Sequence, residues 1–159
     1  YGWAVRTIGL VTLATYVAAG VAKLENSGVD WALGDALRQH IAYDAVRKIE
    51  LGSIYSPLAA WLVPAAWLFP LLALFTLAVE FLAPVALLGT RWAVGWCAAA
   101  WLFHVGVLAS MAIVFPYPLS GAAFLSLFPL ERWRSARGLR WLAERLPRPG
   151  RSQPVHGGA

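Results

Sequence analysis

Long apolar runs separated by short polar stretches make up most of the pattern of hydrophobic and polar positions along this chain. Three of these runs, at about 3–23, 66–88 and 92–115, reach the roughly 20 residues that an α-helix needs to cross a lipid bilayer. The pattern therefore predicts an all-α, polytopic membrane protein with about three transmembrane helices. Residues 1–130 hold these spans and form the predicted transmembrane domain.

Shorter segments between and after the spans predict helices that lie at the membrane interface or re-enter it. Asp35 can begin a helix whose apolar stripe includes Ile41. Pro57 suits the first turn of a short helix that ends near Val63. The apolar segment 119–130 is only twelve residues long, so we expect it to re-enter or to lie flat rather than to cross.

The C-terminal end of the chain is basic. Residues 131–146 have apolar positions at helical spacing and predict a basic amphipathic helix, and 147–159 are rich in Pro, Gly and Ser and predict a disordered tail. Seven arginines between Arg132 and Arg151 indicate contact with anionic lipid rather than with nucleic acid. The positive-inside rule predicts that this tail lies on the cytoplasmic side of a bacterial plasma membrane. A crossing by 119–130 would reverse that orientation.

Composition supports the membrane interpretation and excludes some chemistry. Hydrophobic residues make up 60% of the 159 positions and charged residues 13%, whereas soluble domains carry about 25% charge. Cys97 is the single cysteine, which excludes an internal disulfide and thiol–disulfide exchange within the chain. No cluster of ligating side chains predicts a metal site. The chain begins at Tyr1 beside a membrane helix, so we expect it to be part of a longer protein with additional helices.

Three ionisable side chains stand in or at the edge of the apolar spans: Lys23, Glu80 and His104. A charged side chain at the centre of a span costs about 2.5–3.5 kcal/mol, so each needs a partner or a function. Glu80 and His104 have similar expected depths on consecutive spans and could hydrogen-bond, which would fix the register of the helices. Lys23 is either an interfacial lysine that snorkels to water or a partly desolvated amine that acts as a base. Lys23, His104 and Glu80 are therefore the candidate catalytic residues.

Four further residues are candidates for binding a substrate near Lys23. Tyr16 and Gly20 share one face of the first helix with Lys23, and the glycine permits close helix packing. Trp31 and Tyr43 could complete an aromatic pocket with Tyr16. The alternative is that these aromatic side chains are interfacial anchors, since Trp and Tyr favour that region of a membrane.

These residues stand in an order that resembles a known family. The motif YVAAGVAKL at 16–24, with Trp31 and Gly34 after it, is similar to a motif of the vitamin K-dependent gamma-carboxylases. It is also similar to their bacterial relatives, the horizontally transferred transmembrane (HTTM) domain proteins. The later motifs VEFLAP at 79–84, Phe103-His104 and FPY at 115–117 follow in the same order, and the resemblance covers roughly 7–129.

The resemblance implies a chemistry for Lys23. In the family, the lysine of this motif is the base that deprotonates reduced vitamin K, and carboxylation of a protein glutamate follows. The cofactor implied here is therefore reduced vitamin K or a related quinol. Family helices that precede the motif, with a further catalytic histidine, are absent from this chain, as is the large domain that engages the glutamate substrate.

Two functions are compatible with these observations. The first is a carboxylase-like or quinol-epoxidase-like lyase that uses Lys23 as a base on a quinol-like substrate. The second is a non-enzymatic membrane module that binds a lipid or a quinone, or that acts as a scaffold. The partners expected in both cases are the lipid bilayer and the missing helices of a longer chain.

Overall fold

The computed structural model describes residues 2–128, and every regular element in this range is helical. The predicted amphipathic helix at 131–146 and the predicted tail at 147–159 lie outside the described residues. The elements, in chain order, are α1 (Gly2–Ser27), α2 (Val29–Ala32), α3 (Asp35–Glu50), α4 (Leu58–Leu62), η1 (Ala66–Leu68), α5 (Phe69–Phe81), η2 (Ala83–Leu88), α6 (Thr90–Met111), α7 (Pro116–Leu119) and η3 (Ala122–Leu127), where η denotes a 3₁₀ helix.

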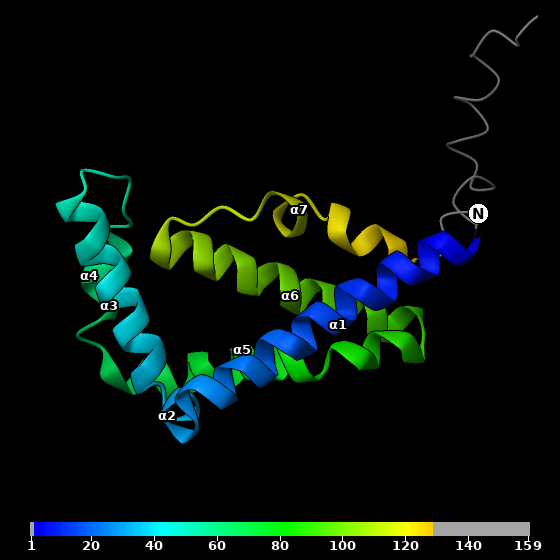
Figure 1. The fold of residues 1–159 in the computed structure, drawn as a ribbon, viewed down its shortest axis with the longest axis horizontal. Coiled ribbons are helices and arrows are strands. Elements are labelled where there is room, and N and C mark those ends of the chain that lie inside the picture. The colour runs from blue at the N-terminus through cyan, green and yellow to red at the C-terminus, as the bar shows by residue number, and fades with distance from the viewer. Residues whose placement is uncertain (1, 129–159) are drawn as a thin grey trace, which may run out of the picture. The chain divides into compact units, whose positions relative to one another are not determined.

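The prediction of an all-α chain is confirmed for the described residues, and two of the three predicted spans are single long helices. Both α1 and α6 are long and apolar enough to cross a membrane. Figure 1 shows α1 running beside α5 and η2, with which it is in contact. The helix predicted up to Phe115 ends earlier, at Met111, because Ala112 adopts a left-handed conformation (φ 52°) that stops α6.

The third predicted span, 66–88, is not one continuous α-helix. It consists of η1, α5 and η2, and α5 ends at Phe81. Pro84 explains this end, because proline has no N–H to donate to the carbonyl of Glu80 and its ring would clash with that carbonyl in an α-helix. Leu82 closes the last turn of α5, and the chain continues as the 3₁₀ helix η2.

The shorter predicted helices are also present. α3 begins at Asp35, and α4 follows Pro57 at its N-cap. The segment 119–130 is described as far as residue 128 and contains η3, which packs against α1. η3 has six residues, so this part of the segment does not form a membrane-crossing helix.

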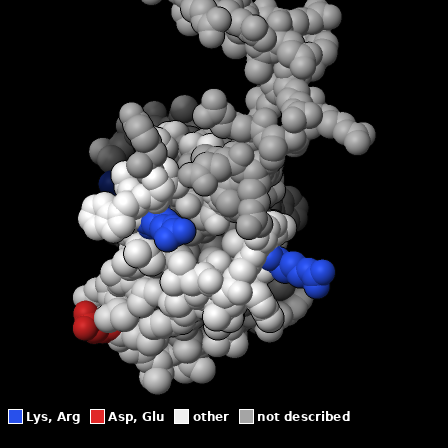
Figure 2. Space-filling model, turned by 90° about the vertical axis from the view of Figure 1, so that its right-hand side faces the viewer, with Lys and Arg blue, Asp and Glu red and all other residues white. Residues whose placement is uncertain are grey.

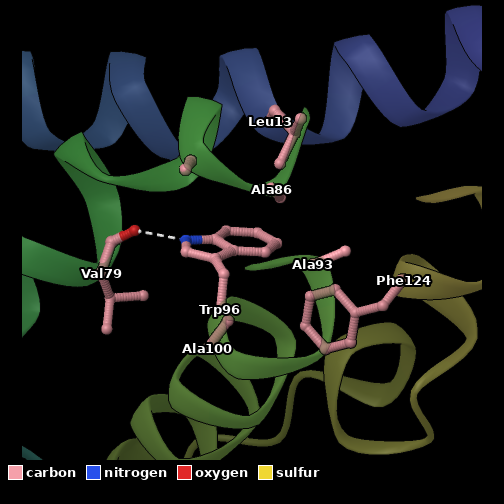
Figure 3. Packing of buried hydrophobic residues seen from close by; sticks show 8 residues of the cluster. Leu13, Val79, Ala86, Ala93, Trp96, Ala100 and Phe124 are labelled. Atoms are coloured by element: carbon pink, nitrogen blue, oxygen red, sulfur yellow. Dashed lines mark hydrogen bonds between the residues drawn. The ribbon is translucent and has the colours of Figure 1, made fainter. Parts of the chain in front are cut away.

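The main core forms where α1, α5, η2, α6 and η3 meet, around the indole of Trp96 (Figure 3). Trp96 donates a hydrogen bond from its indole nitrogen to the carbonyl of Val79, 2.8 Å away. This carbonyl lies at the end of α5, where the last carbonyls of a helix lose their intrahelical partners. Phe124 packs edge-on against Trp96, with ring centroids 5.8 Å apart. The other buried members are Leu13, Ala83, Ala86, Ala93 and Ala100.

A second, smaller core joins α3, α4 and the start of α5 through Ile41, Ala59 and Phe69. Gly34, which precedes α3, has φ +87° and lies against the α5 backbone. A Cβ atom at this position would stand 2.4 Å from the carbonyl carbon of Phe69. Only glycine therefore allows the turn before α3 to approach α5 this closely.

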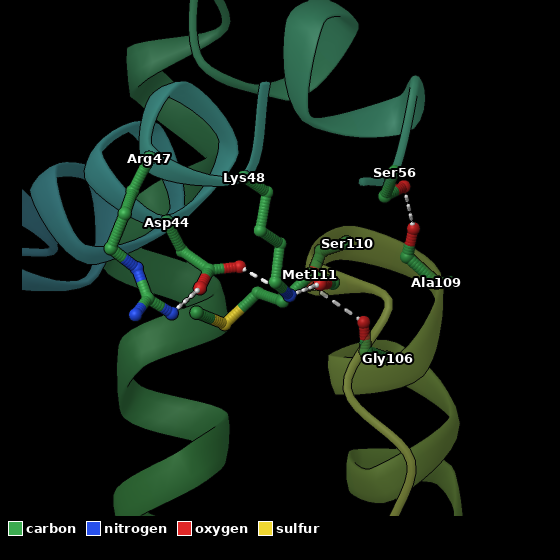
Figure 4. A network of polar contacts seen from close by, with 8 residues as sticks. All are labelled: Asp44, Arg47, Lys48, Ser56, Gly106, Ala109, Ser110 and Met111. Atoms are coloured by element: carbon green, nitrogen blue, oxygen red, sulfur yellow. Dashed lines mark hydrogen bonds and ion pairs between the residues drawn. The ribbon is translucent and has the colours of Figure 1, made fainter. Parts of the chain in front are cut away.

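Polar side chains of α3 and of the loop after it close the C-terminal end of α6 (Figure 4). The Lys48 ammonium lies 2.8 Å from a carboxylate oxygen of Asp44 and donates to the Met111 carbonyl at 2.5 Å. Ser56 donates to the carbonyl of Ala109. These carbonyls are in the last turn of α6, where a helix lacks internal donors and favours a positive charge.

The Asp44 carboxylate makes the stability contributed by these contacts at the end of α6 dependent on pH. Burial alone would raise the pKa of Asp44, but hydrogen bonds from Lys48 and Arg47 outweigh it and hold the pKa below its ordinary value of 3.8. A carboxyl with a depressed pKa in the folded state stabilises the fold above its unfolded pKa, and this contribution is lost as the pH falls through the folded pKa.

We therefore expect wild type to be more stable than Asp44→Asn at neutral pH, and the difference to shrink as the pH falls below 3.8. Chemical unfolding of both proteins across this range, followed by tryptophan fluorescence, measures the difference. Arg47→Gln is a milder control, since its side chain is half exposed and keeps the Lys48 pair intact. Parallel stability curves for wild type and Asp44→Asn would contradict the role assigned to Asp44.

Candidate functional site

Two polar pairs bridge α1 to its neighbours in the interior of the helical unit. The Lys23 ammonium donates a hydrogen bond to Oε1 of Glu80 on α5. About two turns earlier on α1, the Tyr16 hydroxyl lies 2.7 Å from Nε2 of His104 on α6. These four residues, with Trp31 and Phe103, are called the Lys23 site below.

The pairing of Lys23 with Glu80 depends on how closely α1 approaches α5. Gly20 lies at the crossing, where an added Cβ atom would stand 3.1 Å from the Cβ of Glu80 and 3.1 Å from the ring of Phe81. A larger residue would push the helices apart, as expected for a small residue at a helix contact. The lysine one turn beyond Gly20 is thereby brought to the Glu80 carboxylate.

This geometry corrects one prediction and shows where the Lys23 amine lies. The expected hydrogen bond between Glu80 and His104 is wrong, because Glu80 binds Lys23 and His104 binds Tyr16. Lys23 is also not a snorkelling lysine: 19% of its side chain is exposed, and its amine is turned inward onto a carboxylate that is 3% exposed.

Aromatic rings surround the Lys23 amine. The Nζ atom lies 4.8 Å from the ring centroid of Trp31 and 5.3 Å from that of Phe103, distances at which a cation is attracted by a ring face. Trp31 is held in place by a hydrogen bond of 3.2 Å from its indole nitrogen to the Thr76 hydroxyl on α5. The turn around Gly34 supports Trp31 further, since the Gly34 N–H donates to the Trp31 carbonyl at 3.0 Å.

The Tyr16–His104 pair is enclosed in the same way. Tyr16 packs edge-on against Trp96. The ring centroid of His104 lies 4.9 Å from that of Phe103 and 5.2 Å from that of Phe115. If the phenol donates to Nε2, the ring proton of a neutral His104 is on Nδ1. The pair then presents a ring N–H donor beside the Lys23–Glu80 ion pair.

Two buried polar atoms of the site have no hydrogen-bond partner within residues 2–128: Oε2 of Glu80 and Nδ1 of His104. Glu80 is 2% exposed and His104 is 7% exposed. Buried polar atoms are rarely left unpaired, so both are positions at which a ligand or a water molecule would be stabilised. Both atoms lie among the aromatic side chains of the Lys23 site.

The structure therefore brings together six of the seven residues singled out from the sequence. Lys23, Glu80, His104, Tyr16, Gly20 and Trp31 all belong to the Lys23 site or to the helix crossing beneath it. Tyr43 does not: its side chain is 70% exposed. It lines a separate cavity of about 490 Å³ together with Ser27, Ala36, Gln39 and His40.

Sequence reasoning missed two residues that support the site. Thr76 lies one turn before Glu80 on α5, and this spacing was the available signal for a shared face. The Phe103 ring lies over the Lys23 amine. The only sequence signal for this role was its position next to His104. In the described part of the chain, no three His, Cys, Asp or Glu side chains gather in a group that could hold a metal ion.

Comparison of this chain with protein-family models, with curated proteins and with solved structures finds no match.

Proposed function

We propose that this chain is an integral membrane protein of a bacterial plasma membrane in which Lys23 takes a proton from a quinol-like substrate. The observation that carries the proposal is the buried hydrogen bond from Lys23 to Glu80, among aromatic side chains and beside unpaired polar atoms.

The distribution of exposed side chains supports the membrane part of the proposal. Both α1 and α6 are long and apolar, yet only 17% of the most apolar part of each helix is buried. A core helix of a soluble protein with this composition would be mostly covered. Here apolar side chains such as Ile8, Leu71 and Trp92 are more than half exposed, as expected where lipid is the solvent. We propose that η1, α5 and η2 together form a third crossing.

Glu80 gives Lys23 a way to become a base. Amines and phenolic hydroxyls have similar ordinary pKa values, about 10.4 and about 10, whereas a carboxylate is too weak a base for a phenol. Lys23 passes one proton to Glu80 along their hydrogen bond, and the neutral amine then accepts the proton of the quinol hydroxyl. The substrate O–H bond breaks, and the pair gains one proton in total.

The other residues of the site hold this pair in place. Trp31 and Phe103 exclude water from the amine, and exclusion of water strengthens each electrostatic contact inside the site. The Tyr16–His104 pair presents its free ring nitrogen as a second contact for a substrate oxygen. These residues orient the substrate, while the proton moves through Lys23 and Glu80.

The deprotonated quinol is then oxidised by O2 from air, one oxygen atom of which becomes the epoxide oxygen while the other leaves as water. The proposal is tested by incubating the full chain in liposomes with a reduced naphthoquinone in air and measuring epoxide formation. We expect epoxide that depends on both the protein and the quinol. Quinol bound without any product would contradict the enzymatic proposal and would favour the non-enzymatic module instead.

A further inference from the structure

The two unpaired polar atoms of the Lys23 site lie on side chains that are closed off from the surroundings of the protein. Glu80 is 2% exposed and His104 is 7% exposed, and Oε2 of the first and Nδ1 of the second have no partner in the described residues. Such atoms are stabilised when a ligand or a water molecule reaches them. A side chain that covers the site must therefore move before a substrate can contact them.

Three aromatic rings lie beside the ring of His104. The ring centroids of Tyr16, Phe103 and Phe115 are 5.9, 4.9 and 5.2 Å from that of the histidine. Tyr16 is fixed by its hydrogen bond to His104, and both Tyr16 and Phe103 pack against the main core. Phe115 is 42% exposed and is not among the buried or half-buried side chains of either core within residues 2–128. Of the three rings, Phe115 can therefore leave His104 with the least disturbance of the fold.

The backbone before Phe115 has few hydrogen bonds. α6 ends at Met111, and Ala112 is the one non-glycine residue of the described range with a positive φ, of 52°. From there the chain runs back beside α6 to α7, which brings Phe115 to His104 (Figure 1). None of the N–H groups of 113–115 donates a backbone hydrogen bond within residues 2–128. A segment with exposed side chains and few backbone hydrogen bonds opens locally at low cost.

The cover on the other side of the site is fixed more firmly. Trp31, whose ring lies over the Lys23 amine, is 7% exposed. Its indole nitrogen donates to the Thr76 hydroxyl, which in turn donates to the carbonyl of Ala73 at 2.8 Å. Displacement of Trp31 would leave buried polar groups unpaired, which is costly. The Phe115 side chain has no polar atom, so its displacement breaks no side-chain hydrogen bond.

The surface around Phe115 is uncharged. Residues 92–128 contain no Lys, Arg, Asp or Glu, and the neighbouring Val114 is 61% exposed. Figure 2 looks onto the end of the molecule at which α1 begins, where charged side chains likewise stand singly among uncharged ones. An exposed surface that is apolar and uncharged fits contact with hydrocarbon better than contact with water. A substrate that approaches Phe115 therefore arrives from the lipid.

We propose that the quinol-like substrate, whose class rests on the proposed function above, enters the Lys23 site from the lipid when the Phe115 ring moves away from His104. The aromatic ring of the substrate then occupies the place beside His104 that the Phe115 ring has left. Phe115 controls the rate of entry and of exit, and no bond of the substrate is made or broken at this residue.

Stopped-flow binding of a reduced naphthoquinone to the full chain in liposomes, under argon, tests this route. Loss of tryptophan fluorescence reports binding, and the absence of oxygen prevents turnover. We expect Phe115→Ala to raise the association and dissociation rates together by at least about tenfold, with Kd within about threefold of wild type, because a conformational step that limits entry also limits exit. A higher dissociation rate with an unchanged association rate would identify Phe115 as an ordinary substrate contact and would overturn the proposal.

Two further variants separate the role of Phe115 from a general effect of losing a ring. Tyr117→Ala removes a 74% exposed ring two positions along the chain, which is not among the rings found beside His104 in the described residues. It should change both rates by less than about twofold. Phe115→Leu keeps most of the apolar volume, so its rates should lie between those of wild type and Phe115→Ala. Equal changes for Tyr117→Ala and Phe115→Ala would overturn the proposal.

Variation of the amount of lipid tests entry from the bilayer. At fixed total quinol, doubling the lipid about halves the mole fraction of quinol in the bilayer, so the association rate should fall about twofold. An unchanged rate would indicate entry from water and would overturn the route. Binding by this route without epoxide formation in air would overturn the enzymatic proposal alone, whereas a wild-type chain that binds no quinol would overturn both proposals.

Discussion

Replacement of Lys23 by alanine is expected to lower the free energy of unfolding by about 3–5 kcal/mol, the range found when one partner of a buried ion pair is removed. Glu80 is 2% exposed, and its second carboxylate oxygen already has no partner within residues 2–128. Without Lys23, both of its oxygens are left unpaired in the interior. Equilibrium unfolding in mixed micelles, followed by tryptophan fluorescence, measures this loss.

Removal of both partners tests whether the loss comes from the uncompensated carboxylate. In the double variant Lys23→Met, Glu80→Leu, no charge is left at the contact between α1 and α5, so its stability should return to within about 1–2 kcal/mol of wild type. Glu25→Ala, which removes an exposed charge from the same helix, should change stability by no more than about 0.5 kcal/mol. A double variant as unstable as Lys23→Ala would contradict the description of Lys23 and Glu80 as a coupled pair.

Gly34→Ala is the second substitution expected to have a large effect. A Cβ atom at this position would stand 2.4 Å from the carbonyl carbon of Phe69 and 2.5 Å from the nitrogen of Pro70, and both are backbone atoms that cannot rotate away. The positive φ of 87° adds strain for any residue with a side chain. We expect a loss of about 2–4 kcal/mol in the free energy of unfolding from strain and overpacking together.

Gly52→Ala is the matched control for this prediction. Gly52 also has a positive φ, of 62°, but nothing lies within 4 Å of a Cβ atom built on it. It should therefore lose only about 1 kcal/mol, the cost of the backbone conformation alone. Unfolding measured under the same conditions compares the two variants. Equal losses at Gly34 and Gly52 would contradict a close contact between the turn before α3 and the beginning of α5.

The helical elements could be predicted largely from local patterns. Runs of apolar residues identified α1 and α6, and Asp35 and Pro57 marked the beginnings of α3 and α4 because helix starts have local chemical requirements. Pro84 was visible in the sequence, but its effect was not assigned. A proline can either kink a helix or end it, and here the α-helix ends at Phe81 and continues as η2.

The partners of the buried polar groups were harder to predict than the groups themselves. Lys23, Glu80 and His104 stood out because charged or polar side chains are costly in apolar helices. Which of them pair depends on the rotation and crossing of helices far apart in sequence. The crossing at Gly20 brings Lys23 to Glu80 and leaves His104 to Tyr16. Tyr43 lies outside the Lys23 site because α3 turns it outward, and the local sequence pattern does not indicate that direction.

The most direct test of the central claim, that Lys23 is a base supported by Glu80, is epoxide formation by Lys23→Arg in liposomes. Arginine keeps the positive charge and can pair with the Glu80 carboxylate, but its guanidinium does not release a proton. We expect stability within about 1 kcal/mol of wild type and at least about a 100-fold lower rate of epoxide formation, the loss typical for a missing general base. A stable Lys23→Arg protein that forms epoxide at the wild-type rate would contradict the account.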